Sequence, residues 1–431
     1  MKTKENTQKN FVQPFSEYLM EHRDHIKLYL ITLIKWLFSS AIIGFGVGII
    51  GSAFVLAITK VTSLRQDNPW LLFFLPLAGF LTVLFYRITR QRDNTGTNLV
   101  IASIQYEDSH IPAVIMPLMF ICTIMTHLTG GSAGREGAAL QIGGSFGNTF
   151  GRLMRFEEKD RKIMIICGMS ACFSALFGTP AAAAIFSIEV VTVGIMQYSA
   201  LVPAVLSAVI ARYTARAMFH IPKGVYELGE IPEFNLVLFS KTLLLAACFA
   251  FASILLILAL HKFDELFDIT LKNDYIRAIV IGLIVIAMRY IFGTTDYLGA
   301  GGDYIAGSFT VSRPWFSFLL KILFTAITLG GGLKGGEIVP SMFVGATLGS
   351  FLAPVLGLPI GLCAACGMVS VFCGATNCPL TSLILGIEMF GDNGIYYILI
   401  CVALTYMLSD YFSLYKAQRI AYSKFTPVAR K

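Results

Sequence analysis

Charged side chains are scarce in this sequence. Asp, Glu, Lys and Arg make up 14% of the 431 residues, whereas a soluble domain carries about 25%. Hydrophobic residues make up 56%, and the mean hydropathy is +0.71. This composition excludes an ordinary soluble domain and the basic soluble surface that nucleic-acid binding requires. It predicts an all-α integral membrane protein in contact with the lipid bilayer.

Several long segments contain no charged residue. Ranges 36–59, 163–188 and 190–211 lack Asp, Glu, Lys and Arg, and 338–387 is long enough for more than one crossing. A membrane-spanning helix needs about 20 apolar residues. The range 278–288 is shorter, because Arg277 and Arg289 bound it. We therefore expect full crossings together with short, interrupted helices.

The two ends of the chain are polar. Residues 1–27 have no short basic tip followed by an apolar core, so we expect no cleaved signal and a cytoplasmic N-terminal segment. Residues 416–431 are basic without an acidic residue, which the positive-inside rule places in the cytoplasm. The sequence thus predicts a multi-pass cell-membrane protein with both termini cytoplasmic and an even number of crossings.

The nine cysteines lie in apolar segments, and their number is odd. Cys363 and Cys366 are close in sequence but have no His or acidic residue nearby. Buried free thiols acting as small hydrophobic side chains are the expected state. We expect neither a metal site nor a cofactor.

The pattern Phe-x6-Pro-x8-Glu occurs twice, and a glycine-rich break precedes each copy. We predict a membrane domain over 28–415 built from two related halves, about 30–215 and 235–415. Paired halves with interrupted helices indicate a transport site at the interface of the repeats. The glutamates of the pattern are expected to cap or brace helices. The pattern residues are Phe173, Pro180 and Glu189, and then Phe372, Pro379 and Glu388.

Three glycine-containing breaks precede apolar helical segments. They are "SAGREGAALQ", "GGEIVPSMF" and "NTGTNLVIASI", in which Thr97 and Asn98 are candidate capping groups. A helix start offers unpaired N–H groups and the positive end of the helix dipole, and glycine lets a ligand approach the backbone. Three such starts meeting inside the membrane would bind a small desolvated anion.

Glu136 follows the first break, where a charge is costly and usually functional. Ionised, its carboxylate can occupy an anion site; protonated, it can leave. The structural alternative is an ion pair with Arg135. Lys334 and Glu337, beside the second break, are expected to pair with each other, and His127 to be satisfied locally.

Ser132 lies in "GGSAG", which also matches the G-x-S-x-G pattern of hydrolases. That pattern requires a strand, a turn and a helix, followed by an acid and a histidine. Range 111–129 instead has the character of a membrane helix. An intramembrane hydrolase using Ser132 is therefore a remote alternative, and we expect the protein not to be an enzyme.

The motifs "GREG", "GGEIVP" and "SLYKAQ", with the duplicated Phe/Pro/Glu segments, resemble the CLC chloride channels and proton-coupled anion exchangers. The resemblance implies a homodimer with one pore in each subunit and tilted, broken helices in two inverted halves. It assigns the external gate to Glu136, central anion contacts to Thr97 and Tyr415, and backbone contacts to Ile338 and Val339. The expected anion-binding set is Thr97, Asn98, Gly134, Arg135, Gly137, Glu337, Ile338, Val339 and Tyr415.

Departures from the common CLC pattern point to one branch. Val190 stands where chloride/proton exchangers have an internal proton glutamate, and Glu337 adds an acid before the second helix. Both features are similar to the fluoride/proton exchangers. Thr97 and Val339 differ from that branch, so a chloride channel or chloride/proton antiporter is the alternative. The chain also ends soon after the last predicted helix, and we expect no cytoplasmic CBS domains.

Overall fold

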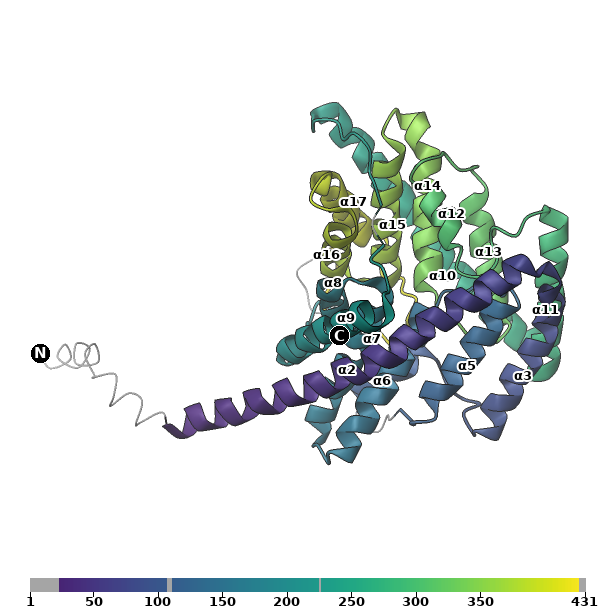
Figure 1. The fold of residues 1–431 in the computed structure, drawn as a ribbon. Coiled ribbons are helices and arrows are strands. Elements are labelled where there is room, and N and C mark those ends of the chain that lie inside the picture. The colour runs from purple at the N-terminus through teal and green to yellow at the C-terminus, as the bar shows by residue number, and fades with distance from the viewer. Residues whose placement is uncertain (1–22, 107–110, 225, 426–431) are drawn as a thin grey trace, which may run out of the picture.

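The computed structural model describes residues 23–106, 111–224 and 226–425 (Figure 1). Within these residues the chain is predominantly helical with very little strand, which confirms the all-α prediction. One short parallel pair joins β1 (Thr192–Val193) to β2 (Arg419–Ile420). The expected N-terminal segment lies almost wholly outside the described residues, as do the last residues of the basic tail.

The helices divide into a first set before the loop at 220–235 and a second set after it. The first set is α2 (Arg23–Asp67), η1 (Pro69–Phe74), α3 (Leu75–Ile88), α4 (Thr97–Gln105), α5 (Ile115–Leu128), α6 (Glu136–Leu153), α7 (Glu158–Phe177), α8 (Pro180–Glu189), η2 (Tyr198–Ala200) and α9 (Leu201–Phe219). The second set is α10 (Leu236–Thr270), α11 (Asp274–Phe292), α12 (Gly302–Gly307), α13 (Ser317–Gly330), α14 (Ile338–Leu356), α15 (Ile360–Thr376), α16 (Pro379–Phe390) and α17 (Ile395–Leu408).

Six of the described helical segments are long and apolar enough to cross a membrane, and several shorter apolar helices accompany them. Such short helices are tolerated where their ends find polar partners inside the protein, as the starts of α8 and α16 do. The prediction of an interrupted segment at 278–288 is wrong. α11 is continuous from Asp274 to Phe292, because Arg277 lies in its first turn and forms ion pairs there.

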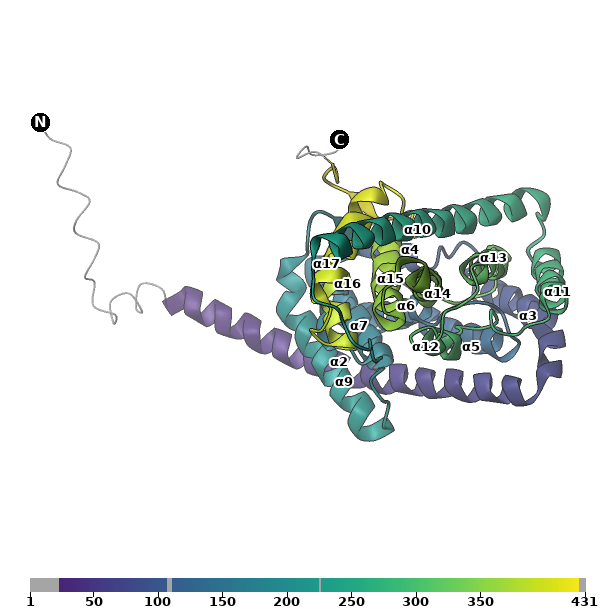
Figure 2. The same cartoon turned by 90° about the horizontal axis from the view of Figure 1, so that it is seen from above.

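The central helices lie between two long ones. Seen from above, α2 and α10 flank opposite sides of the molecule, with α6, α7, α14 and α15 between them (Figure 2). α6 approaches α7 so closely that a Cβ on Gly143 would collide with the Gly168 carbonyl, and Gly345 on α14 has the same relation to Gly367 on α15. Glycine at these crossings lets the backbones touch and sets the positions of α6 and α14.

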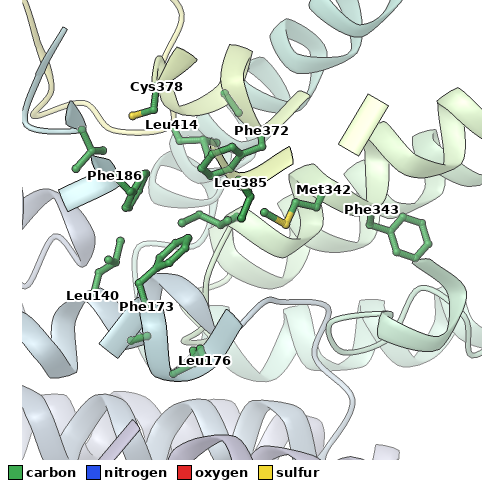
Figure 3. Close-up of a cluster of buried hydrophobic side chains, with 14 of the residues drawn as sticks. Leu140, Phe173, Leu176, Phe186, Met342, Phe343, Phe372, Cys378, Leu385 and Leu414 are labelled. Carbon is green, nitrogen blue, oxygen red and sulfur yellow. The ribbon is translucent and has the colours of Figure 1, made fainter. Parts of the chain in front are cut away.

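The two phenylalanines of the duplicated pattern belong to one buried cluster. Phe173 stacks on Phe186 with ring centroids 5.0 Å apart, and Phe186 lies 5.9 Å from Phe372 (Figure 3). Leu385 and Met342 lie beside them (Figure 3). The cluster therefore joins helices of both sets at the centre of the molecule.

The two glutamates of the pattern cap helices, as predicted. Glu189 accepts hydrogen bonds from the N–H groups of Leu380 and Thr381 at the start of α16 (3.0 and 2.8 Å). Glu388 accepts from Ala181 and Ala182 at the start of α8 (3.2 and 2.8 Å). These contacts tie α8 to α16.

Candidate ion pathway

The starts of α6 and α14 lie against each other. Gly134 and Gly336, which precede the two helices, exchange backbone hydrogen bonds of 2.7 and 2.8 Å. Two of the three predicted breaks thus form one isolated bridge, with the positive ends of two helix dipoles beside it. A negative charge at this bridge is electrostatically favoured.

Glu136 is the first residue of α6 and occupies this position. Its side chain is 1% exposed. One carboxylate oxygen accepts a hydrogen bond of 2.9 Å from the Arg135 N–H, and the other lies 3.7 Å from the Arg135 guanidinium. The backbone amide of Val339, at the start of α14, also interacts with the carboxylate. Glu136 therefore does form the ion pair with Arg135 that was the structural alternative to a gating role. It also has backbone contacts from two helix starts.

A cavity of about 690 Å³ leads toward this site from the side of the molecule that carries residues 414–417. Four residues of the expected anion-binding set line it: Thr97, Asn98, Glu337 and Tyr415. The other expected site residues, Gly134, Arg135, Glu136, Gly137, Ile338 and Val339, do not line this cavity. Ile338 and Glu136 are almost fully buried, so the described structure has a wide vestibule that ends before Glu136.

Tyr415 is one of the residues that line this vestibule. The residue is 2% exposed, and its hydroxyl has no hydrogen-bond partner among the described residues. Tyr415 and Glu337 line the vestibule together, so the two side chains border the same space. A buried O–H without a partner is costly unless something accepts its hydrogen bond. The geometry is suited to an anion beside Tyr415.

The start of α4 has a different arrangement from the one expected. Gly96 is the N-cap and has no capping side chain, so neither Thr97 nor Asn98 caps the helix. The Thr97 hydroxyl lies 3.5 Å from the Gly137 carbonyl. The Asn98 side chain accepts a hydrogen bond from the Ala417 N–H (2.9 Å) and so holds α4 against the segment after Tyr415.

The predicted pair between Lys334 and Glu337 is wrong. The structure forms no ion pair between these two described residues. The Lys334 ammonium instead lies 4.6 Å from the centre of the Tyr86 ring on α3, and both Lys334 and Glu337 line the vestibule. A cation–π contact with a distant segment replaces the local pair.

Two polar residues near the pathway were absent from the expected set. Gln141 lines the vestibule one turn after Gly137, to whose carbonyl it donates a hydrogen bond of 3.2 Å. Lys321 on α13 is fully buried and donates to Ser132 Oγ and to the carbonyls of Tyr297 and Gly299 (3.1, 3.2 and 2.6 Å). The signal for Lys321 was available, because it is a single charge in the apolar run "SFLLKILF".

Ser132 is a structural residue of the loop before α6. Its hydroxyl contacts Lys321 and Thr325, and its N–H donates to the Thr328 hydroxyl. Ser132 is fully buried and does not line the vestibule. His127, the nearest histidine in sequence, contacts the Gly134 carbonyl (3.3 Å), as expected of a locally satisfied group. All nine cysteines are free thiols.

Comparison with known proteins now identifies the family. The family model described as "Voltage gated chloride channel" matches residues 77–410. The chain belongs to this family, the CLC family. Its fold of broken helices is accordingly the CLC fold, and the protein is a multi-pass membrane protein.

Two relatives share about a third of their residues with this CLC protein. A "Chloride/fluoride channel protein" of Pseudomonas syringae pv. tomato is 32% identical over 398 residues, which is 91% of this chain and 88% of the relative. The crystal structure of a CLC-type fluoride/proton antiporter superposes with a TM-score of 0.86 at 31% identity, covering 90% of this chain and 98% of the other.

A more distant structure has the same fold. A slow cyanobacterial Cl⁻/H⁺ antiporter superposes with a TM-score of 0.72 at 19% identity, over 87% of this chain and 94% of the other. The names of these three proteins describe transporters or channels, and none describes an enzyme.

Proposed function

We propose that this CLC protein exchanges fluoride for protons across the cell membrane and so exports fluoride. The observation that carries the proposal is Glu136, a buried carboxylate at the meeting point of two helix starts. The names of the two relatives near one-third identity, a chloride/fluoride channel protein and a fluoride/proton antiporter, support fluoride as the anion. Val190 stands where chloride/proton exchangers have an internal proton glutamate, and the absence of a carboxylate there supports the fluoride/proton branch.

In the proposed mechanism, one side chain serves both ions. With Glu136 ionised, its carboxylate occupies the bridge between α6 and α14 and blocks an anion from it. Protonation removes the charge, the side chain leaves, and an anion from the vestibule takes its place beside Tyr415. Because carboxylate and anion exclude each other, each anion that passes is linked to protonation of Glu136.

Each expected site residue then has a proposed role. Thr97 and Tyr415 supply hydroxyl donors to the anion in the vestibule, and the backbone at Gly134, Gly137, Ile338 and Val339 forms the site at the bridge. Arg135 stabilises the ionised gate through its N–H and its guanidinium. Asn98 positions α4, and Glu337 adds an acid on the vestibule wall.

Chloride transport is the second candidate, as a channel or as a chloride/proton antiporter. The family model carries a chloride-channel description, and Val339 places no hydroxyl at the start of α14. A less polar site favours the larger anion, because fluoride needs more hydrogen-bond donors to replace its water.

The assembly and topology form part of the proposal. We propose a homodimer, two halves at about 30–215 and 235–415, and cytoplasmic termini. Exposed apolar residues on α9 and α17, including Val202, Val209, Tyr396 and Leu399, are consistent with burial in lipid or against a second copy. The vestibule, which opens beside residues 414–417, then faces the cytoplasm.

The decisive test uses purified full-length protein in liposomes loaded with fluoride or chloride, with external pH recorded at a fixed membrane potential. The proposal predicts fluoride efflux with proton uptake and much slower chloride efflux. Chloride efflux as fast as fluoride efflux would assign the protein to chloride transport, and the pH record would then separate exchanger from channel. Hydrolysis of an ester or peptide that is lost in Ser132→Ala would instead support the remote hydrolase alternative.

A further inference from the structure

A second, smaller cavity of about 70 Å³ lies between α3 and α11, next to the vestibule. Four of the residues that line it are basic, namely Arg87, Arg92, Arg277 and Lys334, and one, Asp274, is acidic. A space of this size admits more than one water molecule. Its walls carry an excess of positive charge, which favours an anionic occupant.

Asp274 forms ion pairs with the three arginines but does not neutralise their combined charge. Its carboxylate lies 3.1 Å from Arg87 Nη2, 3.1 Å from Arg92 Nε and 3.4 Å from Arg277 Nη2. Arg277 also pairs with Asp268. Each guanidinium has five N–H donors and no acceptor, so the two carboxylates leave most of these donors and part of the positive charge unpaired.

Three of the four basic groups, those of Arg87, Arg277 and Lys334, are held in place before any ligand binds. The Arg87 guanidinium lies 4.6 Å from the centre of the Tyr275 ring, and Lys334 lies over Tyr86. The Arg277 side chain is 16% exposed, and its buried Nε has no hydrogen-bond partner among the described residues. Side chains that are already fixed lose little conformational entropy when a ligand binds to them. A buried N–H donor that has no acceptor is stabilised when a ligand supplies one.

We propose that this cavity binds a phosphate group. Planar guanidinium forks match the oxygen geometry of phosphate, and several of them around one small space suit its charge. The group can come from free inorganic phosphate or from an anionic lipid headgroup. Both sources have access, because Arg92 is 62% exposed and α3 and α11 belong to membrane-spanning segments.

Binding at this site regulates entry into the vestibule. Arg92, Arg277 and Lys334 line both cavities. A phosphate group on them cancels positive charge at the mouth of the vestibule and lowers the local concentration of the transported anion. The site therefore acts as an inhibitory phosphate sensor, a role separate from the proposed ion exchange.

The first experiment measures binding without reference to transport. The thermal unfolding midpoint of the purified full-length protein in neutral detergent is followed against inorganic phosphate, with gluconate keeping ionic strength constant. We expect a saturable rise, because a ligand that binds the folded state stabilises it. Arg87→Gln should raise the half-saturating phosphate concentration about tenfold through loss of one charge-assisted contact.

Arg87 is a suitable position because it lines this cavity and not the vestibule. The matched control is Arg152→Gln, which removes the same charge from an exposed position at the end of α6 and should leave the phosphate response unchanged. Arg92→Gln, at a more exposed residue, replaces Arg87→Gln if that variant does not fold. No saturable response, or the same response in the wild type and the cavity variants, would overturn the proposal.

A second experiment distinguishes the two sources. Flux of the transported halide is measured in neutral phosphatidylcholine vesicles and in vesicles that also contain phosphatidylglycerol, with and without phosphate. Inhibition by free phosphate in both vesicle types identifies the soluble ion. Slower flux in phosphatidylglycerol vesicles, with phosphate acting only in neutral ones, identifies the lipid. Flux that is equal in all four conditions contradicts a regulatory role.

Discussion

Glu189 and Glu388 cap each other's helices. Each lies near the end of its own short helix, α8 or α16, and accepts hydrogen bonds from the first N–H groups of the other helix. Glu189 is the more buried of the two and also accepts from the Thr381 hydroxyl at 2.6 Å. The exchange places a negative charge at the positive end of each helix dipole.

Glu189→Ala should destabilise the protein more than Glu388→Ala. The first variant leaves two N–H groups and a hydroxyl without an acceptor, two of them on the fully buried Thr381, for a cost of about 2–3 kcal/mol. The second affects the N–H groups of exposed Ala181 and buried Ala182, with no hydroxyl involved, and should cost about 1 kcal/mol. Thermal unfolding in one detergent measures both. Equal thermal unfolding midpoints for the two variants would contradict the prediction that the buried cap formed by Glu189 contributes more to stability than the cap formed by Glu388.

Lys321→Met should loosen the loop that leads into α6. The variant removes the donor shared by Ser132, Tyr297 and Gly299 and should destabilise the protein by about 2 kcal/mol, because buried acceptors lose their partner. It should also lower the number of protons moved per anion, since Ser132 belongs to the loop that positions Glu136.

Lys321→Arg, which keeps the charge and the donors, should recover much of that coupling. Lys262→Met is the matched control, because Lys262 is exposed on α10 and pairs only with Glu265 among the described residues. The measurement is the reversal potential in liposomes with opposed anion and proton gradients. Reduced flux at an unchanged reversal potential would mean that Lys321 supports folding alone.

Val339→Thr should increase selectivity for fluoride over chloride. The change adds a hydroxyl donor at the start of α14, where the Val339 amide already interacts with Glu136. One hydrogen bond is worth about 1 kcal/mol, or about a fivefold change in relative flux. Val355→Thr, at an exposed position of the same helix, is the control. A selectivity ratio that does not move would place Val339 outside the pathway.

The sequence was informative where its pattern is local. The starts of α6 at Glu136 and of α14 at Ile338 follow from the glycine-rich breaks and the apolar runs after them. The capping role of Glu189 and Glu388 followed from their matched positions in the two copies. Such features depend on neighbouring residues and on composition, which a single chain displays directly.

Contacts between segments that are distant in the sequence could not be predicted from local patterns of this kind. The Lys334 ammonium contacts the Tyr86 ring on α3 and forms no ion pair with its sequence neighbour Glu337. The N-cap residue of α4 is Gly96, whereas the sequence suggested capping by Thr97. Gln141 was missed because one glutamine in a helix gives no sign of the cavity that it lines. The continuity of α11 was also missed, since Arg277 finds its acidic partners only in the folded chain.

The most direct test of the account is the proton movement of Glu136→Gln in liposomes. The variant keeps the size of the side chain and mimics its neutral form, so the gate no longer titrates. We predict that fluoride still crosses down its gradient while proton uptake falls to the level of empty liposomes, and that Glu337→Gln retains coupling. Proton uptake that persists with fluoride efflux in Glu136→Gln would contradict the shared gate.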